Sequence, residues 1–211
     1  MAAVASMDDL ELVGGSVALD FANTGSIEGA PPSERLRTFD DLVTFARRTD
    51  LIGDGRAAEL RSMAAAAPAR AAAVLERARE LRDTLHRVFT AVAVSGRPED
   101  AHVESLNTFL EEGMRYRRLE RDERCCGWTW AAGDEPLAQM LWPIVNEAAD
   151  LLVDGELERV KRCGNDTCAW LFVDLSRNRS RRWCDMKDCG NRAKARRHYA
   201  RRKGSAGPGP T

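Results

Sequence analysis

Four of the six cysteines fall in two close pairs near the C-terminus. Four residues separate Cys163 from Cys168, fifteen residues follow, and four more separate Cys184 from Cys189. Two such pairs can supply two edges of a tetrahedron, the geometry in which thiolates bind Zn²⁺. The spacing therefore predicts one zinc ion held by these four residues. Because four cysteine ligands leave no open coordination position, the ion is expected to be structural and not catalytic.

The surroundings of the cysteines favour a metal over other uses of thiols. A module of about forty residues cannot bury enough surface to fold without a metal or disulfides. No Lys or Arg precedes Arg35 and no apolar run could span a membrane, so the chain is predicted to be cytoplasmic, where thiols stay reduced. A disulfide pair, buried free thiols and an iron–sulfur cluster are the alternatives. Cys125 and Cys126, adjacent in a predicted hairpin, would point to opposite faces and are not expected to be ligands.

The net charge of -1 conceals a separation of charge along the chain. Residues 161–211 contain 14 basic and 4 acidic residues, a net of +10. Residues 1–160 contain 18 basic and 29 acidic residues, a net of -11. A basic end on an acidic body indicates an anionic partner for that end.

A helix predicted over 188–202 concentrates the positive charge. Eight basic residues and one acidic residue lie between Lys187 and Lys203, and zinc would bring them beside the basic loop that precedes Cys184. The guanidinium group of Arg suits phosphate oxygens, so the partner is predicted to be a nucleic acid; a solvated surface without a partner is the alternative. The predicted contact residues are Arg177, Arg179, Arg181, Arg182, Asn191, Arg192, Lys194, Arg196, Arg197, His198, Arg201 and Arg202.

The chain before the cysteines has the patterns of a mainly helical body. Apolar residues at three- and four-residue spacing over 74–92 give the strongest helical signal, whereas 115–131 has the pattern of a hairpin. The expected fold class is α+β: a mainly α N-terminal domain with a small β-hairpin, then a small treble-clef-like zinc finger. The other expected elements are a strand at 16–24, helices at 39–46, 56–67 and 99–112, a helix from 136 to 154 kinked at Pro143, a strand at 170–173 and the helix at 188–202.

Two stretches resemble known families. The segment RSRRWCDMKDCGNRAKARRHYARR, preceded by CAWLFVDLSRN, resembles the CGNR zinc-finger family, which is named for residues that here are Cys189, Gly190, Asn191 and Arg192. The body, with its ALDFANT start, resembles the ABATE domain that usually accompanies this finger. The resemblance implies an ABATE-like domain at 10–155 and a finger at 160–203, with 204–211 expected to be a disordered tail. Members of the family are regarded as stress-linked bacterial transcription regulators, and their finger is assumed to bind DNA.

The predicted function is therefore that of a zinc-dependent, DNA-binding transcription regulator. Its body would sense an unknown small molecule or form a homodimer, and no membrane contact is expected. RNA binding is an alternative, because phosphate contacts do not distinguish the two sugars; a protein-interaction module is another. An enzyme is not expected, because no nucleophile elbow, phosphate loop or zinc-protease motif occurs. The polar residues available to an enzyme in the body are Asp20, Asn23, His86 and His102.

Overall fold

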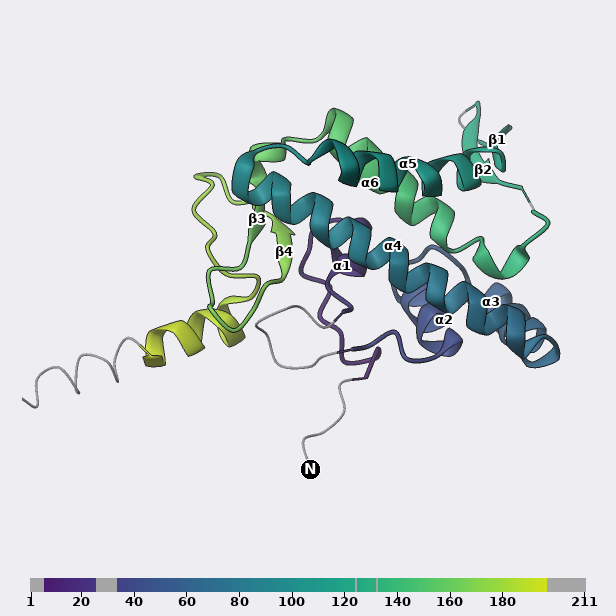
Figure 1. Cartoon of the computed structure of the whole chain (residues 1–211), viewed down its shortest axis with the longest axis horizontal. Helices are drawn as coiled ribbons and strands as arrows, with labels where there is room; N and C mark the ends of the chain where they lie inside the picture. The colour runs from purple at the N-terminus through teal and green to yellow at the C-terminus, as the bar shows by residue number, and fades with distance from the viewer. Residues whose placement is uncertain (1–5, 26–33, 124, 132, 197–211) are drawn as a thin grey trace, which may run out of the picture.

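Helices make up most of the chain, and one long helix spans the N-terminal body (Figure 1). The computed structural model describes residues 6–25, 34–123, 125–131 and 133–196. The helices are α1 (Val17–Ala22), α2 (Phe39–Arg48), α3 (Asp54–Ala66), α4 (Pro68–Ser95), α5 (Asp100–Met114) and α6 (Leu141–Asp154). The strands are β1 (Arg117–Glu120), β2 (Gly127–Trp130), β3 (Val160–Arg162) and β4 (Leu171–Val173). The predicted fold class, a mainly helical body with a hairpin followed by a small finger, is confirmed.

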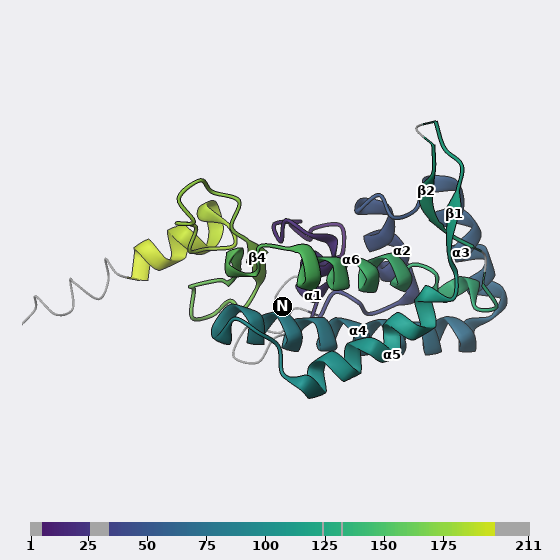
Figure 2. The same cartoon turned by 90° about the horizontal axis from the view of Figure 1, so that it is seen from above.

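The long helix α4 forms the centre of the body. It begins at Pro68, where the missing backbone N–H costs nothing, and ends before Gly96, whose φ of 80° is a left-handed cap. Its apolar stripe, including Leu81, Leu85 and Phe89, is fully buried. Helices α1, α2, α5 and α6 all contact it, as Figures 1 and 2 show from two directions. The body thus has one continuous core along α4.

The prediction of a strand at 16–24 is wrong, because these residues form the short helix α1. The alternation of small and large apolar residues suggested a strand with one buried face. In the structure all residues from Ala18 to Ala22 are buried, so no exposed face exists to show the helical period. Glu147 of α6 accepts hydrogen bonds from the Ser16 hydroxyl and the Val17 amide, both at 2.9 Å, and so caps the helix from outside.

The predicted kink at Pro143 is also absent. A single 3₁₀ turn, Pro136–Ala138, precedes α6, and the α-helix itself begins only at Leu141. Pro143 therefore lies in the first turn of α6, where its lack of an N–H removes no helical hydrogen bond. The helix ends at Asp154 before Gly155, as the sequence predicted.

The finger follows α6 directly and packs against one end of the body. Strands β3 and β4 pair antiparallel, with Lys161 opposite Phe172, and β3 contacts α4. Asp185 caps a π-helical turn, Met186–Gly190, which continues as α-helix to 196. This helix begins near the last cysteine, as predicted, and it projects away from the body (Figures 1 and 2). The rest of the predicted helix at 188–202 and the predicted tail lie outside the described residues.

Within the described ranges, no helix has both the length and the apolar character needed to cross a membrane.

Candidate metal centre

The four cysteines predicted to bind zinc converge on one point. Cys163 directly follows β3, and Cys168 lies in the turn before β4. Cys184 precedes the π-helical turn, and Cys189 lies within that turn. All four Sγ atoms lie within 4.8 Å of one another, with 3.7 Å between Cys168 and Cys184 and 3.6 Å between Cys184 and Cys189. A tetrahedral zinc with Zn–S bonds of about 2.3 Å places its sulfurs about 3.8 Å apart. The cluster therefore fits one Zn²⁺.

Without a cation, the four thiols of the cluster cannot all be ionised. Hydrogen bonds from Cys168 and Cys184 hold the pKa of Cys163 far down, at about 2, so one sulfur is readily ionised. Ionisation of the neighbouring thiols is then disfavoured. The contact with Cys163 raises the pKa of Cys168 to about 12 and also raises the pKa of Cys184. Four thiolates at this distance repel one another unless a metal neutralises them. A bound zinc would deprotonate all four and tie the two halves of the finger together.

Side chains outside the ligand set orient Cys189. The Asn165 amide donates to its Sγ at 3.2 Å, and the Arg192 guanidinium donates to it at 3.6 Å. Arg196 in turn donates to the Asn165 carbonyl oxygen. Such outer contacts fix a ligand's rotamer and stabilise its charge. Asn165, which is buried, was not predicted as a site residue, and its place between Cys163 and Cys168 is the one signal in the sequence that could have found it.

Each residue of the Cys-Gly-Asn-Arg motif has a structural role in the turn that carries it. A Cβ on Gly190 would lie 2.6 Å from the Met186 sulfur, so a larger residue there would displace the Met186 side chain from the turn. The Asn191 amide donates to the Lys187 carbonyl at 2.7 Å, and Arg192 forms an ion pair with Asp188. The motif therefore shapes the turn around Cys189.

Asp174 organises the basic loop between the two cysteine pairs. Its fully buried carboxylate accepts from Lys161 Nζ at 2.6 Å, from the Ser176 hydroxyl at 2.6 Å and from the Arg181 amide at 2.9 Å. Burial alone would raise its pKa, but Lys161 and these hydrogen bonds outweigh burial and lower it. The loop is thus held at both ends by one carboxylate.

Several residues predicted to contact nucleic acid are already engaged within the protein. Arg179 pairs with Glu156 at 2.9 Å and with Glu158 at 3.0 Å. Arg181 lies over the Phe172 ring and donates to backbone carbonyls, including that of Val13 in the body. Arg192 and Arg196 are likewise engaged, with Asp188 and Asn165 respectively.

The remaining predicted contacts are exposed or undescribed. Arg177, Arg182 and Lys194 are exposed and pair with no carboxylate in the part of the chain that the structure describes, and the same holds for Lys187. Arg197, His198, Arg201 and Arg202 lie outside the described residues.

Comparison with protein families assigns both parts of the chain. The ABATE model, described as a putative stress-induced transcription regulator, matches residues 15–155. The chain belongs to the ABATE family. The CGNR zinc-finger model matches residues 159–202, which contain all four clustered cysteines. Both predicted resemblances are thus confirmed, and neither family is of an enzymatic type. No curated protein is significantly similar to the chain.

The CGNR finger is bound tightly to the ABATE domain. The Asn23 side chain forms two hydrogen bonds with the backbone of Leu171 in β4: it donates to the carbonyl at 2.9 Å and accepts from the amide at 2.8 Å. The Val173 amide donates to the Gly14 carbonyl at 2.8 Å. Leu171 belongs to the body's core. The first segment of the body therefore hydrogen-bonds to β4 of the finger's small sheet.

The polar residues predicted to be available to an enzyme do not form one site. Asn23 is committed to Leu171, and His86 Nε2 lies 3.3 Å from the Ala169 carbonyl of the finger. Asp20 accepts from the Gly14 amide at 2.7 Å, which closes the loop before α1. Three of the four candidates, all except His102, thus have partners that suit a structural role.

Asp20 gives a prediction about pH. Burial raises the pKa of Asp20 from 3.8 to about 6, and the nearby Glu147 charge adds to the effect. The folded protein therefore binds more protons than the unfolded chain between pH 4 and 6, so stability falls as pH rises through that window. We expect Asp20→Asn, which keeps the acceptor for Gly14, to raise the free energy of unfolding at pH 7.5 by about 1 to 3 kcal/mol.

Urea unfolding of both proteins at pH 4 and pH 7.5 measures this effect. The gain should be large at pH 7.5 and small at pH 4, and Asp8→Asn at an exposed position should show neither change. An Asp20→Asn variant less stable than the parent at pH 7.5 would show that the carboxylate is needed in its charged form.

Proposed function

We propose that the protein is a DNA-binding transcription regulator whose zinc-braced CGNR finger contacts the phosphate backbone. One observation carries this proposal: four exposed cations of the finger have no carboxylate partner among the described residues. The described residues include no ion pair between the ABATE domain and the helix that follows Cys189. Arg177, Arg182, Lys187 and Lys194 are therefore available to an external anion.

The geometry of the finger supports a large anionic partner. Its helix projects away from the acidic body, which leaves the helix open to a partner (Figures 1 and 2). Arg177 and Arg182 lie on the loop that Asp174 fixes, and zinc holds that loop against the helix bearing Lys194. Cations on a preorganised surface lose little entropy on binding phosphates.

The family descriptions agree with the proposal at a coarser level. The first family is described as a putative stress-induced transcription regulator, and a part that binds a nucleic acid together with a part that receives a signal would suit that role. We assign the first role to the finger and the second to the ABATE domain. DNA is proposed over RNA because a transcription regulator acts on DNA; RNA binding is the competing outcome of the test.

The salt dependence of binding tests this proposal. We expect log affinity for duplex DNA to fall linearly with log salt, by about 0.9 per phosphate contacted. Arg177→Gln/Arg182→Gln should reduce that slope by about two units, because two counterion-releasing contacts are lost. Fluorescence anisotropy with labelled duplex DNA and with structured RNA, over a salt series, measures both slopes.

A double variant at the other end of the molecule is the matched control. Arg118→Gln/Arg121→Gln removes the same charge from the β1–β2 hairpin, which lies far from the finger (Figure 1). Its slope should equal that of the parent. Equal slopes for all three proteins would show that Arg177 and Arg182 do not contact phosphates. Tighter binding to RNA than to DNA at every salt concentration would show that RNA is the partner.

A further inference from the structure

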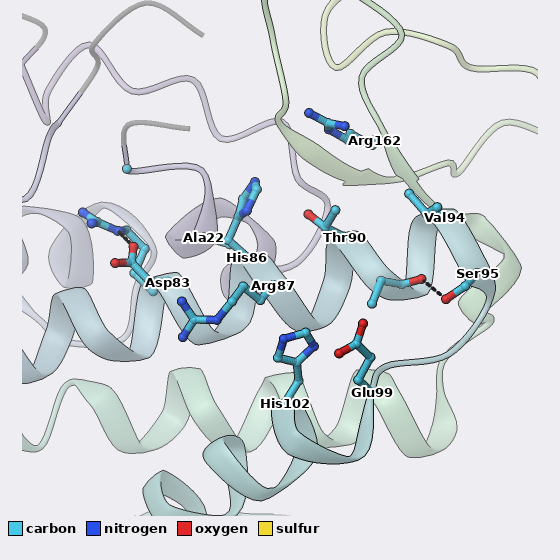
Figure 3. Close-up of a pocket in the computed structure, with 13 residues that line it drawn as sticks. Ala22, Asp83, His86, Arg87, Thr90, Val94, Ser95, Glu99, His102 and Arg162 are labelled. Atoms are coloured by element: carbon cyan, nitrogen blue, oxygen red, sulfur yellow. Dashed lines mark hydrogen bonds and ion pairs between the residues drawn. The ribbon is translucent and has the colours of Figure 1, made fainter. Parts of the chain in front are cut away.

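A large cavity lies where the ABATE domain meets the finger (Figure 3). It has a volume of about 800 Å³, within the range of small-molecule sites. One wall is the face of α4 that bears His86, Thr90 and Val94 at four-residue intervals, opposite the helix's apolar stripe. Arg162 reaches in from β3 on one side, and the start of α5 supplies His102 on the other (Figure 3).

Two buried polar atoms of this cavity lack partners. Thr90 Oγ1 and His102 Nδ1 are inaccessible and form no hydrogen bond with any described residue. A threonine within a helix commonly bonds the carbonyl one turn earlier, and Thr90 does not. An unsatisfied buried polar atom costs about 1 to 3 kcal/mol, but because neither atom is accessible, an occupant could bond one only after its side chain rotates into the cavity.

The cations around the cavity differ in their availability. Arg82 is almost fully buried and saturated: it bonds both carboxylate oxygens of Glu34, at 2.7 and 2.8 Å, and also Asp83. Arg162 is exposed and forms no ion pair with any residue in the described ranges. Arg87 also lines the cavity, is exposed and forms no ion pair with a described residue, so an entering anion would meet unpaired guanidinium groups at Arg162 and Arg87.

The other lining groups limit the charge and shape of that anion. Asp83 and Glu99 place negative charge at the rim, which disfavours a dianion such as phosphate. Ala22, Ala91 and Val94 provide apolar surface between the polar groups. A single carboxylate on an apolar body matches this arrangement, since Arg binds a carboxylate with two parallel hydrogen bonds.

Two residues beside the cavity adjoin the first zinc-ligand pair. Arg162 directly precedes Cys163, and Ala169, which accepts from His86 Nε2, directly follows Cys168. Since a carbonyl can only accept, His86 carries its proton on Nε2 in this contact. An occupant that bonds Arg162 and packs against α4 would contact the finger and the ABATE domain together.

We propose that this cavity is a binding site for a small organic monocarboxylate with an apolar body, held by Arg162. The consequence for regulation rests on the proposed function: the ligand would fix β3 against α4 and so alter the finger's affinity for DNA. Binding itself is independent of that consequence and is tested without nucleic acid.

Amide NMR titration of the full, zinc-loaded chain tests the site with defined probes. Benzoate should bind saturably, with a dissociation constant on the order of 1 mM, and shift resonances of α4, β3 and the start of α5. Benzamide, its neutral isostere, should bind at least about tenfold more weakly, as should benzoate to Arg162→Gln. Arg121→Gln on the distant hairpin should leave benzoate binding unchanged.

Three results would overturn the proposal. They are no saturable shift with benzoate at about 20 mM, benzamide binding as tightly as benzoate, and inorganic phosphate binding more tightly than benzoate. If benzoate binds as expected but leaves DNA affinity unchanged, the site stands and its link to the finger fails. If the finger binds no DNA, the titration still shows whether the cavity binds a carboxylate.

Discussion

Replacing Cys184 with Ser should abolish stoichiometric zinc binding and disorder the finger. Structural zinc contributes about 10 to 16 kcal/mol to the folding of small finger modules, and one missing thiolate forfeits much of this. The Cys184 Sγ atom lies 3.7 Å from the Sγ of Cys168 and 3.6 Å from that of Cys189, so the substitution removes a ligand that adjoins two others. Elemental analysis should give one zinc per chain for the parent and less than one for the variant.

The loss should also spread into the ABATE domain. Leu171 belongs to the body's core and bonds Asn23, and Val173 bonds Gly14, so an unfolded finger removes these contacts. We expect the helical melting transition to fall by about 5 to 15 °C, since about 1 kcal/mol shifts the midpoint of a domain of this size by 2 to 4 °C. A finger that unfolds while the body melts unchanged would show that the two parts are independent.

A cysteine outside the cluster is the matched control. Cys126 is exposed on the β1–β2 hairpin, and its sulfur lies 3.9 Å from that of Cys125, its sequence neighbour. Cys126→Ser should keep one zinc per chain and the parental melting temperature. If Cys184→Ser also retained one tightly bound zinc, the four-cysteine site would be wrong.

The sequence predicts the metal centre well because its signal is local. Two cysteines separated by four residues must lie close together in space, so their spacing alone indicates a shared metal. The module is also so short that it needs a metal to fold. The long helix α4 is equally predictable, because an apolar stripe over many turns and a glycine after the last turn are both strong signals. Thr38 and Asp41 likewise form the capping box that their spacing indicates.

What the sequence cannot predict depends on contacts between distant segments. Residues 16–24 have the pattern of a strand because complete burial removes the exposed face that would reveal the helical period. Arg179 pairs with a carboxylate in the segment just before β3, and Arg181 donates to a backbone carbonyl of the body. A count of positive charges in the sequence therefore overstates how many arginines are free. The cavity beside Arg162 joins that residue to others between 60 and 140 positions earlier in the chain, and no spacing rule connects them.

Asn23 shows most clearly how one side chain can join the two domains. Its amide mimics a neighbouring strand: it satisfies the N–H and the C=O of Leu171, at 2.8 and 2.9 Å, where all these groups are buried. We expect Asn23→Ala to lower the free energy of unfolding by about 2 to 5 kcal/mol, because two backbone groups remain buried without partners. Asn146→Ala, which also removes two hydrogen bonds but leaves its partners in contact with water, should cost about 1 kcal/mol or less.

Amide hydrogen exchange separates a loss of docking from general destabilisation. In Asn23→Ala the Leu171 amide should exchange at least about tenfold faster relative to the amides of α4, because docking opens before the body unfolds. Asn23→Asp keeps the acceptor for that amide but loses the donor to the carbonyl, so it should protect Leu171 better than Asn23→Ala does. If Leu171 and α4 lost protection by the same factor in Asn23→Ala, the finger and the ABATE domain would open as one unit. Asn23 would then stabilise the whole chain, and a signal in the body could reach the finger only through global unfolding or through contacts other than this one.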